Sequence, residues 1–224
     1  MSQSISWTDE FGGAEFGLVQ EKPYPVASPS TVDALAAIVQ YCAEQGWRVL
    51  PMGLGSSFPS NFSLRTERTF AITTSRLREV SRLTNGRIYC QPGVAVQKVL
   101  LCEQTLQRST IGGLICGSGD AATRNAGRLF WQLIHCVEMI DSKGRTVVLP
   151  GPSSPQSLLG ASSTRLLESR GRAGILVGIE FCADELPLEL GGKLLCSTSS
   201  DNLSSPIGRH ASLRGADAMS LFDW

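Results

Sequence analysis

Two glycine-bearing segments hold the residue types of this chain that could do chemistry. The first, residues 51–58, has the sequence PMGLGSSF, and the second, residues 110–119, has the sequence TIGGLICGSG. Glycines leave backbone N–H groups uncovered and serines add hydroxyl donors, which together suit a pyrophosphate held without a charged side chain. A single segment of this kind is more often a surface turn. Two of them in one chain favour a long ligand that lies between them.

Other catalytic chemistry finds little support in the sequence. Ser56 and Ser57 have no identifiable histidine partner for nucleophilic catalysis. His135 sits in an apolar strand pattern without a Cys/His cluster at zinc spacing, so a structural role is expected. Cys116, inside the second glycine segment, is interpreted as a small core residue. The catalytic residues therefore stay unassigned, and no metal site is expected.

The elements around the first glycine segment disfavour a Rossmann loop. Residues 47–50 are typical of a short strand leading into it, but Pro59 and Asn61 follow where a helix would have to begin. The helix is expected before the strand instead. Ser30 is its predicted N-cap, and apolar residues recur at helical spacing until Gly46 ends the run.

Periodicity and turn residues predict the remaining elements. Strands are expected at 69–73 and 175–182, helical structure over 94–106, and hairpins pairing 80–83 with 87–91 and 133–140 with 145–149. Asn85-Gly86 is the dipeptide suited to a type I′ turn in the first hairpin. The stretch 110–119 is too poor in side chains for a packed helix, so its glycines are expected to serve a ligand.

Composition excludes several classes of partner. Twenty Lys and Arg residues balance twenty Asp and Glu residues, so no net field attracts nucleic acid or an anionic membrane. Seven scattered cysteines without a CxxC pair indicate free thiols in a reducing compartment, and a cytoplasmic location is expected. Neither a signal peptide nor a membrane span is recognised.

Four segments, in order, resemble one known family. Residues 25–32, 48–57, 110–113 and 171–176 look like successive motifs of the FAD-binding domain shared by vanillyl-alcohol oxidase and p-cresol methylhydroxylase, the PCMH type. The glycolate oxidase subunits are the nearest in character. The resemblance implies an α+β fold with FAD between a small α/β lobe at about 22–80 and an antiparallel sheet lobe at about 81–186. Residues 1–21 would be an arm and 187–224 a flexible tail.

The same resemblance implies the cofactor-binding residues. The residues that would hold the pyrophosphate are Pro51, Met52, Gly53, Leu54, Gly55, Ser56, Ser57 and Phe58. Those that would line the flavin side are Thr110, Ile111, Gly112, Gly113, Gly117 and Ser118. The backbone of Ile175 would contact the adenine end, and Gly93 would lie at a turn between the two glycine segments. The first segment has no histidine, where covalent members of the family attach their flavin. Any FAD bound here is therefore expected to be non-covalent.

The implied function is an FAD-binding oxidoreductase subunit of the glycolate oxidase or D-2-hydroxy acid dehydrogenase type. Family enzymes continue into a substrate domain, so we expect a larger partner subunit or self-association to complete a site for a small 2-hydroxy acid. An enolpyruvyl-glucosamine reductase is a more distant option. Met52 and Leu54 replace the family's usual arginine and third glycine, and the 93–110 segment is short. These departures favour an alternative, a non-catalytic scaffold that has lost FAD.

Overall fold

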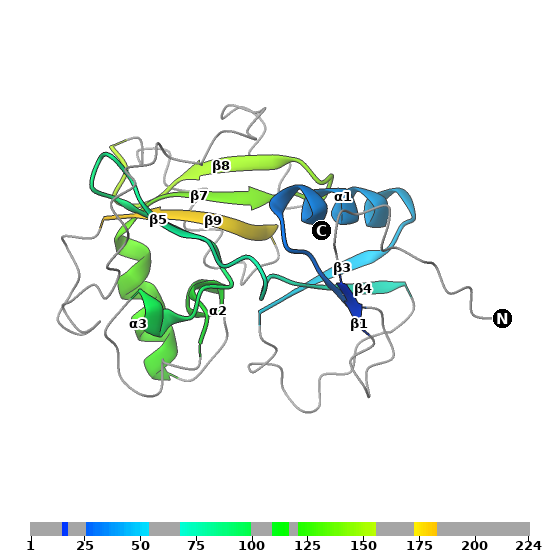
Figure 1. Cartoon of the computed structure of the whole chain (residues 1–224), viewed down its shortest axis with the longest axis horizontal. Helices are drawn as coiled ribbons and strands as arrows, with labels where there is room; N and C mark the ends of the chain where they lie inside the picture. Colours follow the sequence, from blue (N-terminus) through cyan, green and yellow to red (C-terminus); the bar gives the residue numbers. More distant parts are fainter. Residues whose placement is uncertain are drawn as a thin grey trace.

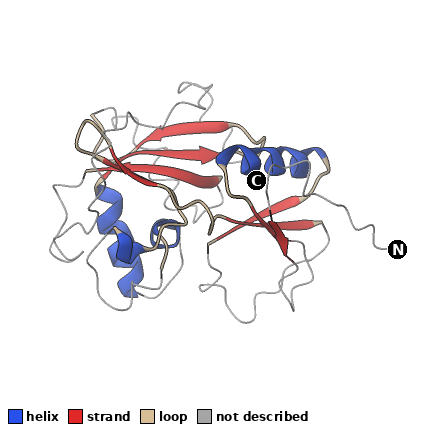
Figure 2. Ribbon diagram, viewed as in Figure 1, coloured by secondary structure: helices blue, strands red, loops and turns tan. Residues whose placement is uncertain are grey.

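The computed structural model describes residues 15–17, 26–53, 68–99, 109–116, 121–155 and 173–182. These ranges form two sheets, with helix α1 over the first and helices α2 and α3 against the second (Figure 1). Parallel pairing dominates the first sheet and antiparallel pairing the second (Figure 2). The expected α+β fold class is confirmed.

The first sheet has four strands in the order β1-β2-β4-β3. The strands are β1 (Glu15–Gly17), β2 (Val26–Ser28), β3 (Arg48–Met52) and β4 (Thr69–Thr73). Both β2 and β3 run parallel to β4. Because parallel neighbours end at the same edge of a sheet, β3 and β4 place their carboxyl ends together. The first glycine segment begins at that edge.

Helix α1 (Val32–Glu44) covers one face of this sheet. Its N-cap is Thr31, not the predicted Ser30: the Thr31 hydroxyl accepts a hydrogen bond from the backbone N–H of Ala34 at 3.1 Å. A capping side chain reaches the N–H groups two or three residues on, so Ser30 lies one residue too early. The helix ends before Gly46, whose φ of +64° suits glycine.

The second sheet has five strands in the order β5-β6-β9-β7-β8, all paired antiparallel. The strands are β5 (Val80–Arg82), β6 (Ile88–Cys90), β7 (Ile134–Ile140), β8 (Thr146–Pro150) and β9 (Ile175–Phe181). Its main core cluster includes residues of α2 (Ile111–Cys116) and α3 (Ala121–Gln132). The last of the described strands, β9, thus joins two hairpins into one sheet.

Three local predictions are wrong. Asn85 does not have a positive φ, and Leu83 N–H bonds to the Arg87 carbonyl, so a three-residue loop with Gly86 at φ +81° replaces the type I′ turn. Within the described part of 94–106, only Val96–Lys98 is helical, as a 3₁₀ turn. Residues 111–116 do form a helix, because Ile111, Leu114 and Ile115 are buried in the core. Three apolar side chains in six residues are enough to pack one turn and a half.

An apolar cluster joins the two sheets beside α1. It contains Ile72 from β4 and Leu35 and Ile38 from α1, together with Ile140, Ile175 and Val177 from β7 and β9, all almost fully buried. We call these six residues the apolar joint. The turn after β7 packs closely there, because a Cβ on Gly144 would lie 2.7 Å from the Ala36 carbonyl oxygen. The joint fixes the two sheets relative to each other. Within the described ranges, no helix is long and apolar enough to cross a membrane.

Candidate cofactor site at the glycine junction

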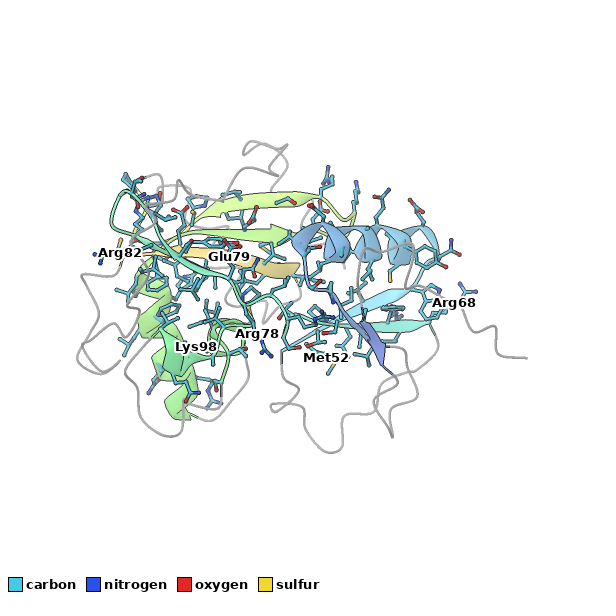
Figure 3. The ribbon with its side chains drawn as sticks, viewed as in Figure 1. Met52, Arg68, Arg78, Glu79, Arg82 and Lys98 are labelled. Carbon is cyan, nitrogen blue, oxygen red and sulfur yellow. The ribbon has the colours of Figure 1, made fainter. Side chains whose placement is uncertain are left out.

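The carboxyl ends of β3 and β4 are tied by two threonines. The Thr73 hydroxyl donates to the Gly53 carbonyl oxygen at 2.8 Å. The Met52 carbonyl oxygen accepts the backbone N–H of Thr74 at 3.0 Å and, more weakly, its hydroxyl at 3.4 Å. Met52 lies at the end of β3, at the lower middle of the molecule (Figure 3). The start of the first glycine segment is therefore held by the strand beside it.

A turn at Pro92 and Gly93 connects this edge to the second glycine segment. The N–H of Gly93 donates to the Leu77 carbonyl at 2.8 Å, just after β4. On the other side, Gly112 N–H donates to the Pro92 carbonyl at 2.9 Å. The segment after β4, the turn and the start of α2 are thus one hydrogen-bonded unit. This unit brings the start of the second glycine segment next to the strand end that precedes the first.

Thr110 stands where the two glycine segments meet. Its hydroxyl oxygen accepts the N–H of Gly113 at 3.1 Å, which caps α2. A Cβ built on Gly53 would lie 3.5 Å from that oxygen, and one built on Gly113 would lie 3.3 Å from it. Thr110 is only 4% exposed. We call Met52, Gly53, Thr73, Gly93 and Thr110–Gly113 the glycine junction.

The glycines near this junction fall into two groups. A Cβ on Gly93 would lie 2.3 Å from the Thr74 carbonyl oxygen, one on Gly112 would lie 2.8 Å from Pro92 Cβ, and one on Gly127 would lie 2.2 Å from the Leu114 carbonyl oxygen. These three glycines are required by packing of the chain on itself. Packing alone accounts for a glycine at position 112, and its predicted contact with a flavin stays a prediction. Among the described residues, a Cβ on Gly53 or Gly113 would meet only the Thr110 hydroxyl, which sets these two glycines apart from the other three.

The structure brings together seven of the sequence-predicted site residues. Met52, Gly53, Gly93, Thr110, Ile111, Gly112 and Gly113 lie at the junction, and Pro51 precedes it on β3. Leu54, Gly55, Ser56, Ser57, Phe58, Gly117 and Ser118 lie outside the described residues. Sequence reasoning missed Thr73, which donates to the Gly53 carbonyl, and Pro92, which accepts from Gly112. The available signal for Thr73 was the Thr-Thr-Ser run that begins at the end of a predicted strand.

Ile175 is placed apart from the other predicted site residues by its side chain. That side chain is 1% exposed and belongs to the apolar joint, and the residue pairs with Ile140 at the start of β9. Among the described residues, no hydrogen bond or strand pairing connects Ile175 to the glycine junction. The role suggested for its backbone at the adenine end stays a prediction.

The polar groups of the junction are backbone amides, backbone carbonyls and hydroxyls, and none of these titrates near neutral pH. The nearest thiol along the chain, Cys116 at the end of α2, packs against the core. Burial raises the pKa of Cys116 to about 12, so the thiol is protonated at neutral pH and a weak nucleophile. The junction is thus suited to binding through dipoles and not through charge.

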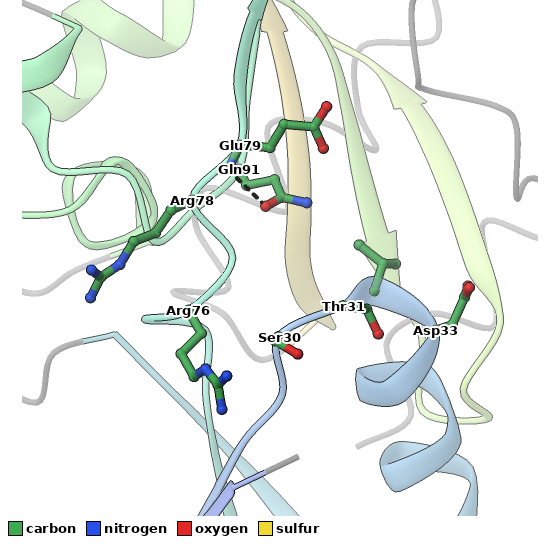
Figure 4. Close-up of a pocket in the computed structure, with 8 residues that line it drawn as sticks. Ser30, Thr31, Asp33, Arg76, Arg78, Glu79 and Gln91 are labelled. Atoms are coloured by element: carbon green, nitrogen blue, oxygen red, sulfur yellow. Dashed lines mark hydrogen bonds between the residues drawn. The ribbon is translucent and has the colours of Figure 1, made fainter. Parts of the chain in front are cut away.

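A separate open pocket lies at the N-terminus of α1 (Figure 4). Its volume is about 430 Å³, and it is lined by Ser30, Thr31, Val32, Asp33, Arg76, Arg78, Glu79 and Gln91. Gln91 accepts the N–H of Glu79 at 2.9 Å and closes one side. Two arginines and two acidic residues contribute to this lining, so it carries no net formal charge. It shares no residue with the glycine junction.

Buried polar side chains occupy the second sheet on the face opposite α2 and α3. Tyr89, Glu138 and Glu180 are each at most 3% exposed, and strand alternation places them opposite core residues such as Ile179. Cys136, paired with Glu180, completes what we call the buried polar face. Arg87 lies 3.8 Å from the Glu180 carboxylate, but burial dominates and raises the pKa of Glu180.

The imidazole of His135 lies at the start of β7, beside this face. A register shift between β7 and β9 occurs between Ile134 and Cys136, where His135 sits. Burial, with a smaller contribution from Arg87, lowers the pKa of His135. Among the described residues, no group of three or more His, Cys, Asp or Glu side chains could hold a metal ion.

Comparison with protein families identifies residues 23–150 as an FAD binding domain. The match covers more than half of the 224 residues, so this chain belongs to the family of PCMH-type FAD-binding domains. FAD is the cofactor of that family, in agreement with the expectation from sequence. A comparison with curated protein sequences gives no match.

Solved structures with a similar fold include two oxidases and a synthase. Chitooligosaccharide oxidase matches 70% of this chain at 20% identity and a TM-score of 0.51, with 35% of its own length covered. Alkyldihydroxyacetonephosphate synthase matches 70% at 19% identity and a TM-score of 0.54, with 31% of its length covered. Glucooligosaccharide oxidase from Acremonium strictum, which carries a 6-S-cysteinyl, 8α-N1-histidyl FAD, matches 75% at 16% identity and a TM-score of 0.52. At these identities the likeness shows the fold, and the chain spans only 31 to 40% of each protein.

Proposed function

We propose that this chain binds FAD non-covalently at the glycine junction. The observation that carries the proposal is that, in the described part of the chain, Gly53 and Gly113 approach only the Thr110 hydroxyl. A Cβ at either position would take up space beside that hydroxyl, and a cofactor held by backbone needs that space. Family membership supplies the identity of the cofactor.

The attachment is proposed to be reversible because the junction offers no suitable nucleophile. Residues 51–58 contain no histidine, and Cys116 is held as a thiol by its raised pKa of about 12. The double covalent link described for glucooligosaccharide oxidase requires both a cysteine and a histidine. Acid or detergent with heat should therefore release all of the flavin. Fluorescence that stays with the denatured polypeptide band would contradict this.

We further propose that the chain works as the FAD-binding part of an oxidoreductase of the glycolate oxidase or D-2-hydroxy acid dehydrogenase type. Bound FAD would supply the hydride-accepting chemistry, while this chain binds and orients it. The described residues at the junction include no candidate general base. A larger partner subunit, or a second copy of this chain, is proposed to supply the base and the substrate pocket.

Binding is tested first, by titrating purified protein with FAD and, separately, with NAD. Flavin absorbance in the purified protein or quenching of added FAD supports the proposal. A colourless protein that ignores FAD would instead support the alternative, a scaffold that keeps the fold without the cofactor. Met52, an apolar side chain at the end of β3 where the family usually has arginine, is the feature that favours this alternative.

The need for a partner is tested by steady-state assays of the monodisperse, flavin-loaded chain. Glycolate, D-lactate and a chitooligosaccharide are supplied with an artificial electron acceptor. Turnover far below that of complete flavin enzymes is expected, since losing the position of donor and base can cost many orders of magnitude in rate. Robust turnover by a monomer would show that no partner is required. Copurification with a second subunit would support the proposal directly.

A further inference from the structure

The hydroxyl of Thr73 makes two hydrogen bonds within the protein. Thr73 is the last residue of β4, and its Oγ1 donates to the Gly53 carbonyl at 2.8 Å while accepting the N–H of Ser75 at 3.2 Å. A threonine hydroxyl has one proton to donate, so this proton is not available to a ligand. The function inferred below therefore concerns the carbonyl that it holds in place.

What it holds is the point where the first glycine segment leaves the sheet. Among the described strands, β3 pairs only with β4, so its other edge has no described strand beside it. Within the described residues, Thr73 is the donor to the Gly53 carbonyl. Because a peptide group is planar, fixing this carbonyl fixes the plane of the peptide that leaves Gly53. Gly53 itself has no side chain that could be packed to do so.

The neighbouring threonine differs in a way that provides a control. The hydroxyl of Thr74 reaches the Met52 carbonyl only at 3.4 Å, and that carbonyl already accepts the Thr74 N–H at 3.0 Å. Removing the Thr74 hydroxyl leaves the Met52 carbonyl bonded. Removing the Thr73 hydroxyl leaves the Gly53 carbonyl without its donor. Two adjacent threonines on one strand end thus make unequal contributions to the same loop.

We propose that Thr73 is a positioning residue of the flavin site, which sets the orientation of the peptide group at Gly53 through the Gly53 carbonyl. The inference rests on the proposed binding of FAD at the glycine junction. When only a fraction of the apo protein has the binding-competent loop, apparent affinity falls by that fraction. The Thr73 hydrogen bond keeps that fraction high.

The test compares Thr73→Val, Thr73→Ser and Thr74→Val in the full chain. Affinity for FAD is measured by quenching of flavin fluorescence, with thermal unfolding measured alongside. Thr73→Val should weaken binding by about tenfold, the factor that corresponds to about 1.4 kcal/mol. Thr73→Ser keeps the hydroxyl and should restore affinity to within about twofold, and Thr74→Val should lie in the same range. Wild-type affinity in Thr73→Val, or equal losses in both valine variants, would overturn the proposal.

A second measurement does not depend on flavin. Hydrogen–deuterium exchange in apo protein should be faster in peptides that contain Gly53 for Thr73→Val than for Thr74→Val, with exchange in β7 unchanged. If the wild type fails to bind FAD, the proposed function is wrong, and the exchange experiment still decides whether Thr73 orders this loop. Identical exchange in the two variants would show that Thr73 does not position it.

Discussion

Two contacts within the described structure differ in the kind of group that forms them. At the apolar joint, buried side chains such as Leu35, Ile140 and Ile175 fill the space between α1 and the second sheet. At the glycine junction, backbone groups and the hydroxyls of Thr73 and Thr110 meet directly, with little side-chain volume. The first contact stabilises through area removed from water, and the second through bonds that need precise backbone placement.

This difference teaches how the fold can be rigid and still leave room for a ligand. The apolar joint fixes the relation of the sheets, so the glycine junction does not have to be filled. Close packing at Gly93 and Gly112 shows that the junction also contains points where the chain meets itself. Open and closed glycines alternate within a few residues there, and substitutions should separate them.

The largest effect is expected from Gly93→Ala, which tests whether the junction carries part of the fold. The new Cβ would lie 2.3 Å from the Thr74 carbonyl oxygen and 2.6 Å from that of Leu77. Both are backbone atoms, so relief requires the main chain to move. We expect a loss of at least about 3 kcal/mol in the free energy of unfolding, or no soluble protein. Urea denaturation checks this, and stability within about 0.5 kcal/mol of wild type would contradict the packing role of Gly93.

A slightly smaller effect is expected from Ile175→Ala at the apolar joint. The side chain is 1% exposed among other apolar side chains, so its truncation leaves a cavity between the two sheets. A loss of about 2–5 kcal/mol in the free energy of unfolding is expected. The milder Ile175→Val, at about 1 kcal/mol, keeps the backbone and should keep FAD affinity. Reduced affinity in folded Ile175→Val would mean that the joint and the cofactor site are coupled.

Gly53→Val is expected to separate binding from stability. Its branched side chain must crowd the Thr110 hydroxyl, which lies 3.5 Å from the Cβ position, and fill the space assigned to the cofactor. FAD affinity should fall about 100-fold, equivalent to about 2.7 kcal/mol. Gly53→Ala, which makes an ordinary contact at 3.5 Å, is the matched control for folding. If the valine variant keeps full flavin content, the site lies elsewhere.

The smallest expected effect is a pH dependence of stability that comes from Glu180, which lies on the buried polar face and belongs to neither the apolar joint nor the glycine junction. Burial raises the pKa of Glu180, so the folded state favours its protonated form. The stability that this group contributes is present at low pH and is lost as pH rises through the folded pKa. The groups facing Glu180 include Arg87 and Cys136. Glu180→Gln should flatten the fall of unfolding free energy with rising pH above the ordinary range of a glutamate pKa.

The glycine junction should not share that pH dependence. Its polar groups are amides and hydroxyls, so FAD affinity is expected to stay level between about pH 5 and 8, where such groups do not titrate. Thermal melts and flavin titrations across this range provide the check. A parallel fall of affinity and stability would show that the buried polar face influences the cofactor site. The same experiment on Glu180→Gln would then identify the group responsible.

Local patterns in the sequence determined most of the elements. Apolar periodicity gave α1 within a residue of its observed end, and the strand at 69–73 matches β4 residue for residue. The order of four motifs was sufficient for the family, because a set of short motifs in fixed order is far more specific than any one of them. Both kinds of signal are local, so they can be read without knowing what packs against them.

Only the tertiary structure decided what each glycine is for. In the sequence Gly112 and Gly113 are neighbours of equal standing, yet one is pressed against Pro92 and the other faces the Thr110 hydroxyl. The role of Thr73 was equally hidden, since its partner Gly53 is 20 residues away in the sequence. Ile175 looked like part of a motif, and its side chain proved to be part of the apolar joint. A residue's type states what it can do, but burial and partners depend on segments that become neighbours only when the chain folds.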